Sequence, residues 1–327
     1  MARAPGHDSG HATGGLSWGD LLALLVAEHG TLAAVAWKLV EHAGSTDEDV
    51  TSVERALRRL RTRGQRDGGR WGQRLLRVFG IPAPVEARVR WFGLYHSPFN
   101  DLPVPLCLDQ LRLWDRPPIA LSRARVWLHL GHASCALRTR RLDDAAAHAD
   151  RARSALPPLP RDYDAARIEV AMVDAFIASR RDVPAVAGAL DRAAALLATA
   201  ELASDERACF EARLVDHRAY QLNQQGAFAD ALALYDALPA GVHPFASYRR
   251  EAGRAYGLHK LGRTADALAL VQVAIEHAGD GGYTRLRAMG LIQLARMQGP
   301  AGEPARARAR AIAERLGDDE LRARADR

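Results

Sequence analysis

The 327-residue sequence predicts an all-α fold, in which a small basic helical domain precedes an array of helical hairpins. Two observations lead to this prediction. A motif of small and apolar residues recurs between Leu142 and Ile312, and the region before it contains segments with the apolar spacing of one helix face. A composition with 48% apolar and 26% charged residues leaves room for two globular domains and argues against global disorder.

We expect four segments along the chain. Residues 1–15 are polar and rich in glycine, which predicts a disordered leader without the apolar core of a secretory signal. Residues 16–80 form the basic helical domain, residues 81–120 a joint dense in proline and aromatic residues, and residues 121–327 the repeat domain. Proline breaks helices, so the joint is expected to contain only short helical pieces.

Composition also bears on the compartment. The longest early apolar run, Leu21–Ala27, is far shorter than the roughly twenty residues that span a bilayer. The three cysteines, Cys107, Cys135 and Cys209, are odd in number and widely spaced, which argues against a disulfide framework. We therefore expect a cytoplasmic protein with no membrane partner.

The basic domain contains three predicted helices. The first runs from Trp18 to His29 and ends at Gly30, and the second runs from the N-cap Thr31 to Ala43. The third follows an acidic loop, and its apolar residues have the i, i+3, i+4, i+7 spacing of a single helix face. These residues are Val53, Ala56, Leu57 and Leu60.

Positive charge concentrates on and after the third helix. Eleven arginines lie between Val50 and Arg90 against three acids, a net charge of +8, whereas the whole chain carries +6. Three short helices with such an excess weakly resemble a helix-turn-helix domain, which implies DNA or RNA binding with the third helix in the major groove. The loop Gln65–Arg70 would then lie along the backbone like a wing. The candidate nucleic-acid-binding residues are Arg55, Arg58, Arg59, Arg63, Arg66 and Arg70.

Two other interpretations of these arginines stay open. Lys38 and Lys260 are the only lysines, so the many arginines are also compatible with a coding bias and a merely solvated surface. A basic face is also suited to an acidic protein partner.

The recurring motif defines the second domain. Its anchor residues are spaced by 41, 45, 36 and 38 residues, which is typical of stacked helical hairpins. A small anchor lets a second helix approach closely, and apolar residues four and seven positions later keep one face turned inward. The five copies begin at Ala145, Val186, Ala231, Ala267 and Ala305.

These copies resemble the tetratricopeptide repeat family over Ser122–Ala323. The third copy carries Gly226, Phe228, Ala231, Tyr235 and Leu238 in the family register, and the fourth carries Gly262, Ala267, Val271 and Ala274. Trp127, Leu130 and Gly131 match the opening signature, although Ser134 replaces its tyrosine. The resemblance implies a superhelix whose first helices line a concave, peptide-binding surface.

Residues one repeat apart would stack along that surface. A spacing of 36 residues aligns four pairs, which make the predicted groove basic, aromatic and hydrogen-bonding. The pairs are Arg213 with Arg249, Tyr220 with Tyr256, Asn223 with His259, and Gln224 with Lys260. Such a wall suits an acidic peptide, because guanidinium groups pair with carboxylates.

We find no catalytic motif and predict a protein that is not an enzyme and needs no cofactor or metal. His129, His132 and Cys135 are close in sequence, but His129 and Cys135 diverge around a helix and no fourth ligand is near. The leading hypothesis is an adaptor or regulator that binds a protein or an acidic peptide through the groove. The alternative is a transcription regulator with an N-terminal helix-turn-helix and a peptide-sensing repeat domain.

Overall fold

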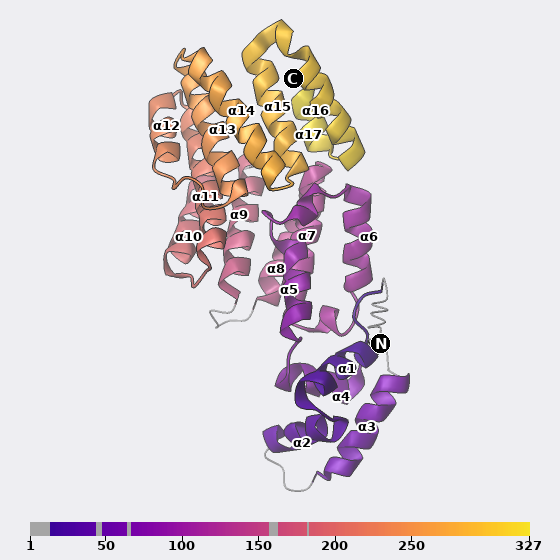
Figure 1. The fold of residues 1–327 in the computed structure, drawn as a ribbon. Coiled ribbons are helices and arrows are strands. Elements are labelled where there is room, and N and C mark those ends of the chain that lie inside the picture. The colour runs from indigo at the N-terminus through magenta and orange to yellow at the C-terminus, as the bar shows by residue number, and fades with distance from the viewer. Residues whose placement is uncertain (1–13, 44–47, 64–66, 157–162, 182) are drawn as a thin grey trace, which may run out of the picture. The chain divides into compact units, whose positions relative to one another are not determined.

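A computed structural model describes residues 14–43, 48–63, 67–156, 163–181 and 183–327. Within these ranges every regular element is a helix and none is a strand, so the all-α prediction is confirmed (Figure 1). The predicted leader lies almost wholly outside the described residues. The chain divides into two compact units. The N-terminal unit comprises the described residues up to Val89 together with Asp109–Arg125, and the repeat unit comprises Arg90–Leu108 and Val126–Arg327.

The N-terminal unit contains the three predicted helices, at α1 (Trp18–His29), α2 (Leu32–Ala43) and α3 (Val50–Arg63). Ser17 begins α1 with a capping box in which Ser17 and Asp20 bond each other's backbone N–H groups, and Gly30 ends it with a positive φ. The buried face of α3 consists of Val53, Ala56, Leu57 and Leu60, as its spacing predicts. These helices share one apolar core with Leu21, Leu25, Val35 and Leu39.

A fourth helix, α4 (Gly69–Val78), follows where the sequence indicated a wing. Gly69 and Arg70 belong to its first turn, so the loop interpretation was wrong for these two residues. The glycines have a packing reason. A side chain at Gly68 or Gly72 would come within 3 Å of the Trp18 ring, which is buried against them.

The predicted joint consists of short helices. They are α5 (Ala83–Gly93), the 3₁₀ turn η1 (Pro98–Asp101), α6 (Val104–Trp114) and the 3₁₀ turn η2 (Ile119–Leu121). The division into units passes through this segment, because residues 90–108 belong to the repeat unit and residues 109–125 to the N-terminal unit.

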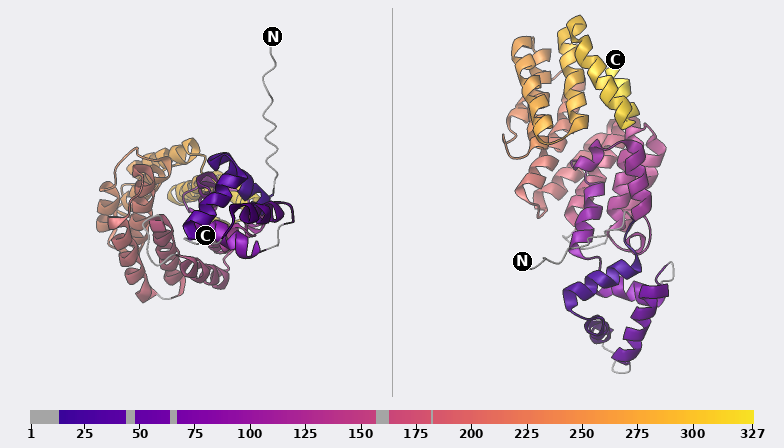
Figure 2. Two further views of the ribbon diagram at one scale, coloured as in Figure 1. Left: turned by 90° about the horizontal axis from the view of Figure 1, so that it is seen from below. Right: turned by 45° about the vertical axis from the view of Figure 1, so that its right-hand side comes forward.

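The repeat unit continues as a series of helices (Figures 1 and 2). They are α7 (Arg125–Arg138), α8 (Leu142–Ala155), α9 (Asp164–Arg181), α10 (Val183–Thr199), α11 (Ser204–Gln224), α12 (Phe228–Asp236), α13 (Pro244–Lys260), α14 (Thr264–Asp280), α15 (Thr284–Gln298), η4 (Gly299–Gly302), α16 (Glu303–Leu316) and α17 (Asp319–Ala325). From α8 to α16 each helix packs on the next, and α9, α11, α13 and α15 also pack on one another in turn.

The recurring motif lies on the second helix of each hairpin. Its five copies fall on α8, α10, α12, α14 and α16, and four of the five anchors are buried. Helices approach closely in the α12–α13 pair, where a side chain at Gly253 would collide with the Tyr235 ring. The arrangement of α8–α16 is consistent with the predicted helical repeats.

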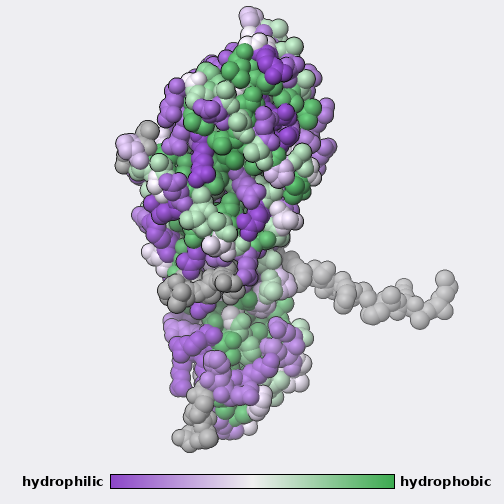
Figure 3. Space-filling model, turned by 90° about the vertical axis from the view of Figure 1, so that its left-hand side faces the viewer, coloured by the Kyte–Doolittle hydropathy of each residue, from purple (hydrophilic) through white to green (hydrophobic). Residues whose placement is uncertain are grey.

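Among the described residues, no single helix is long and apolar enough to cross a membrane; α1 and α2 reach the required length and composition only when taken together across a 90° bend. On the face drawn in Figure 3, hydrophobic and hydrophilic residues are interspersed.

Candidate functional site

The outward face of α3 carries the first candidate residues. Arg55, Arg58 and Arg59 are exposed, opposite the buried apolar face of the same helix. Arg58 donates a hydrogen bond of 2.6 Å to Glu54 one turn earlier. Such an exposed pair contributes little to stability, so this arginine remains available to a partner. Arg63 is the last residue of α3, and Arg66 lies outside the described residues.

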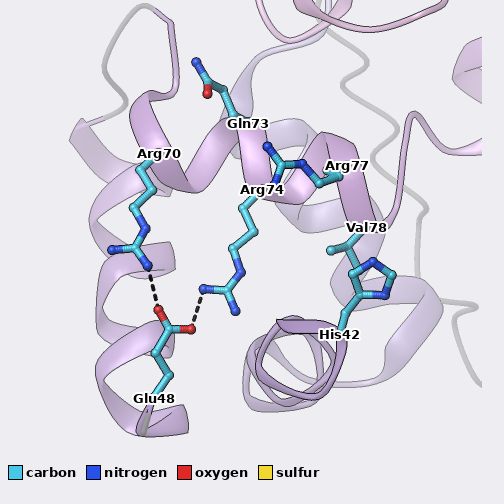
Figure 4. A pocket seen from close by; sticks show the side chains of 7 residues that line it. All are labelled: His42, Glu48, Arg70, Gln73, Arg74, Arg77 and Val78. Atoms are coloured by element: carbon cyan, nitrogen blue, oxygen red, sulfur yellow. Dashed lines mark hydrogen bonds and ion pairs between the residues drawn. The ribbon is translucent and has the colours of Figure 1, made fainter. Parts of the chain in front are cut away.

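A pocket adjoins this helix in the N-terminal unit. It has a volume of about 660 Å³ and lies between the C-terminal end of α2, the start of α3 and the length of α4 (Figure 4). Its lining is almost entirely polar: His42, Glu48, Arg70, Gln73, Arg74, Arg77 and Val78. Figure 4 shows Arg70 and Arg74 extending from α4 toward Glu48.

Arg74 is the fixed member of this pocket. Its side chain is 13% exposed and donates to Glu48 Oε2 at 2.5 Å and to the Leu39 carbonyl oxygen at 2.7 Å. Arg70 donates to the other carboxylate oxygen of Glu48 at 2.9 Å, but its side chain is 74% exposed. Both guanidinium groups also lie over the Trp71 ring, 5.3 and 5.4 Å from its centroid.

Of the pocket residues, only Arg70 was among the candidates from the sequence. Arg70, Arg74 and Arg77 have the spacing of one helix face, a usable signal that was missed because Arg70 was assigned to a loop.

In the repeat unit, the 36-residue spacing places Arg213 and Arg249 on successive hairpins, and a third arginine, Arg285, follows at the same spacing. Arg213, Arg249 and Arg285 stand on α11, α13 and α15, and we call them the arginine ladder. Arg213 and Arg249 are buried, and each ladder residue is paired with an acid. Arg213 donates to Glu169 at 2.6 Å, Arg249 to Asp216, and Arg285 to Asp318 at 2.7 Å.

Tyr95, which lies between α5 and η1, contacts all three arginines of the ladder. Arg249 and Arg285 donate to the phenolic oxygen of Tyr95 at 3.3 and 2.8 Å, and the Arg213 guanidinium lies 4.5 Å from the ring centroid. Burial alone would raise the pKa of this phenol, but the charges of Arg285, Arg249 and Arg213 outweigh it and lower the pKa to about 8.

Further hydrogen bonds hold the residues next to Tyr95 in place. The Tyr95 backbone N–H donates to Glu169 at 3.0 Å, the Tyr283 hydroxyl donates to the His96 carbonyl at 2.9 Å, and Asp101 accepts from the Arg285 backbone N–H at 2.5 Å. We call residues 94–101 the strap. Because the strap and the paired acids occupy them, Arg213 and Arg249 are not presented to solvent.

The other candidates of the predicted groove form an open strip farther along α11 and α13. Tyr220 is 56% and Tyr256 36% exposed, and the ammonium group of Lys260 lies 5.5 Å from the Tyr256 ring centroid. Gln224 is exposed. Within the described ranges, the buried atoms Asn223 Oδ1 and His259 Nδ1 have no hydrogen-bond partner.

His129, His132 and Cys135 lie on α7 in the part of the chain that the structure describes. No three histidine, cysteine or acidic side chains there could hold a metal ion. His132 stacks on His148 with ring centroids 4.7 Å apart, while Cys135 is buried in the core. A hydrogen bond to Cys107 and burial raise the pKa of the Cys135 thiol, which makes it a poor nucleophile.

In comparisons with known proteins, no protein-family model, no curated protein and no solved structure matches this chain. The resemblance to tetratricopeptide repeats therefore rests on the motif residues alone.

Proposed function

We propose that this chain is a non-enzymatic DNA-binding regulator, in which α3 enters the major groove and the helical-repeat unit carries the regulatory contact. The observation that carries the proposal is the two-sided character of α3. One face is buried in the core of the N-terminal unit, and the other presents Arg55, Arg58 and Arg59 to solvent. A helix fits the major groove, where arginine pairs with guanine edges and phosphates.

The peptide-binding adaptor has weaker support than the DNA-binding regulator. The peptide-binding adaptor relied on Arg213 and Arg249 to attract acidic groups. Both are buried and paired with Glu169, Asp216 and the strap residue Tyr95. The arginines of α3 have no comparable internal partners, because only Arg58 forms an ion pair within the described residues. They are therefore the stronger basis for a binding function.

The test is an electrophoretic mobility shift with random-sequence duplex DNA at low and moderate salt. The variant is Arg55→Ala, Arg58→Ala and Arg59→Ala combined. Its matched control removes three exposed arginines of the repeat unit, Arg151, Arg192 and Arg308, by the same substitution. We expect a salt-sensitive shift that the α3 variant loses and the control keeps, with equal helicity in both. A shift absent at low salt, or lost equally in both variants, would refute the proposal.

A second function is favoured by the open strip. Tyr220 and Tyr256 lie one repeat apart with Lys260 beside them, and the partnerless atoms of Asn223 and His259 are nearby in sequence. We propose that a tetratricopeptide-like array uses this strip to bind an acidic peptide or protein. Selection from a displayed peptide library should enrich acidic sequences, and Tyr220→Ala with Tyr256→Ala should abolish the enrichment. Equal enrichment in that variant would exclude the strip.

A further inference from the structure

The pocket of the N-terminal unit has an unbalanced charge. Arg70, Arg74 and Arg77 contribute three positive charges and Glu48 one negative charge, so these four side chains sum to +2. Val78 is the only apolar lining residue. Because the charged lining groups sum to a net positive charge, the pocket suits a compact, doubly charged anion.

Part of the site is already organised without a ligand. Arg74 is held by the Leu39 carbonyl, by Glu48 and by the face of Trp71, so little conformational freedom remains for it to lose on binding. Arg70 shares Glu48 and Trp71 but is mostly exposed, so it can turn toward an incoming ligand. Arg77 and Gln73 are exposed and make no ion pair or hydrogen bond with any residue that the structure describes.

We propose that this pocket binds a phosphate group. Phosphate oxygens accept hydrogen bonds from Arg70, Arg77 and Gln73 at the mouth of the pocket. The positive charge of the less exposed Arg74 stabilises the phosphate. Arginine forks match the geometry of phosphate, and a dianion balances the charge of the site. The group belongs either to a free phosphate monoester or to the backbone of a nucleic acid. The pocket does not depend on the α3 interface, because none of its residues lies on the outward face of α3.

Trp71 provides the readout, because two of the lining guanidinium groups lie over its ring. The full-length protein is titrated with inorganic phosphate while tryptophan fluorescence is recorded, and chloride at matched ionic strength serves as the reference. We expect a saturable change with phosphate only. Arg77→Gln, an exposed substitution, should weaken it by roughly tenfold. Trp71→Phe should remove the signal while phosphate binding persists by calorimetry.

Two further variants separate the sources of phosphate. If Arg70→Gln with Arg77→Gln weakens both the phosphate titration and the duplex shift, the group is supplied by a nucleic acid backbone. If it weakens the titration alone, the ligand is a free monoester. The α3 variant should keep the phosphate response whether or not it binds DNA, so failure of one proposal is distinguishable from failure of the other. A response equal to that of chloride, or unchanged by Arg77→Gln, would overturn the phosphate site.

Discussion

Tyr95 and Arg285 are 190 residues apart in the sequence, yet the guanidinium Nη1 of Arg285 donates a 2.8 Å hydrogen bond to the phenolic oxygen of Tyr95. This bond joins the strap to the third member of the arginine ladder. It places a phenol beside three positive charges, which lower the pKa of Tyr95 to about 8 despite its burial.

The first prediction concerns pH. The Tyr95 pKa is lower in the folded protein than its ordinary value of 10, so the folded state releases this proton first. The free energy of unfolding should therefore gain a contribution as pH rises from about 8 toward 10, and the contribution should be lost as pH falls through 8. Denaturation midpoints across this range, compared with Tyr95→Phe, measure it. Tyrosinate absorbance should show one early titration that the variant lacks; identical curves would contradict the prediction.

The second prediction concerns Asp318, which accepts hydrogen bonds from Arg138 at 3.1 Å and Arg285 at 2.7 Å. Asp318→Asn leaves the buried Arg138 and the largely buried Arg285 without their carboxylate, so it should lower the free energy of unfolding by about 3–5 kcal/mol. The neighbouring exposed pair supplies a control. Asp319→Asn removes an ion pair with Arg322 and should cost at most about 1 kcal/mol. Chemical denaturation measures the free energy of unfolding of both variants. Equal losses would show that the ion pairs of Asp318 stabilise the protein no more than the exposed pair does.

The third prediction tests the close approach of α12 and α13. A side chain at Gly253 would lie 2.1 Å from the Tyr235 ring, so Gly253→Ala should destabilise the repeat unit by roughly 1–3 kcal/mol. A methyl group at Gly279, in the last turn of α14, would have no atom of the described residues within 4 Å. Gly279→Ala should therefore be neutral or stabilise by up to about 1 kcal/mol. Thermal unfolding of both variants decides, and a neutral Gly253→Ala would contradict the close packing of these helices.

The fourth prediction concerns salt. If α3 contacts phosphates, the logarithm of the DNA association constant should fall linearly with the logarithm of salt concentration, and each lost contact should reduce the slope by about 0.9. The α3 variant should therefore have a slope smaller by up to about 3 than the control variant. Filter binding at several salt concentrations measures both slopes. Parallel lines would show that these arginines do not contact DNA.

In the repeat unit, the features that depend on nearby residues of the same helix were predicted best from the sequence. The small anchors Ala145, Ala231 and Ala267 are buried because the same residues that space the motif also allow helices to approach. The burial of Arg213 and Arg249 could not be predicted in this way. Their charges are balanced by Glu169, Asp216 and a strap far away in the chain, and no periodic pattern reports such a partner.

In the N-terminal unit, one helix face was predicted correctly from the sequence and one helix was missed. The apolar spacing of α3 predicted its buried face correctly, whereas Gly68 and Gly69 suggested a loop. The glycine at position 68 has a different reason, since the buried ring of Trp18 occupies the space of a side chain. The pocket was missed together with the helix that lines it.

The strap also bears on how the protein is made. Tyr95 leaves the ribosome long before Arg249, Arg285 and Asp318, the residues that complete its surroundings. In the nascent chain, the strap therefore lacks these bonding partners until the intervening hairpins have been synthesised. Final closure depends on the last part of the polypeptide to be synthesised, so a chain truncated before Arg285 would leave a charged, unfinished surface open to chaperones and proteases.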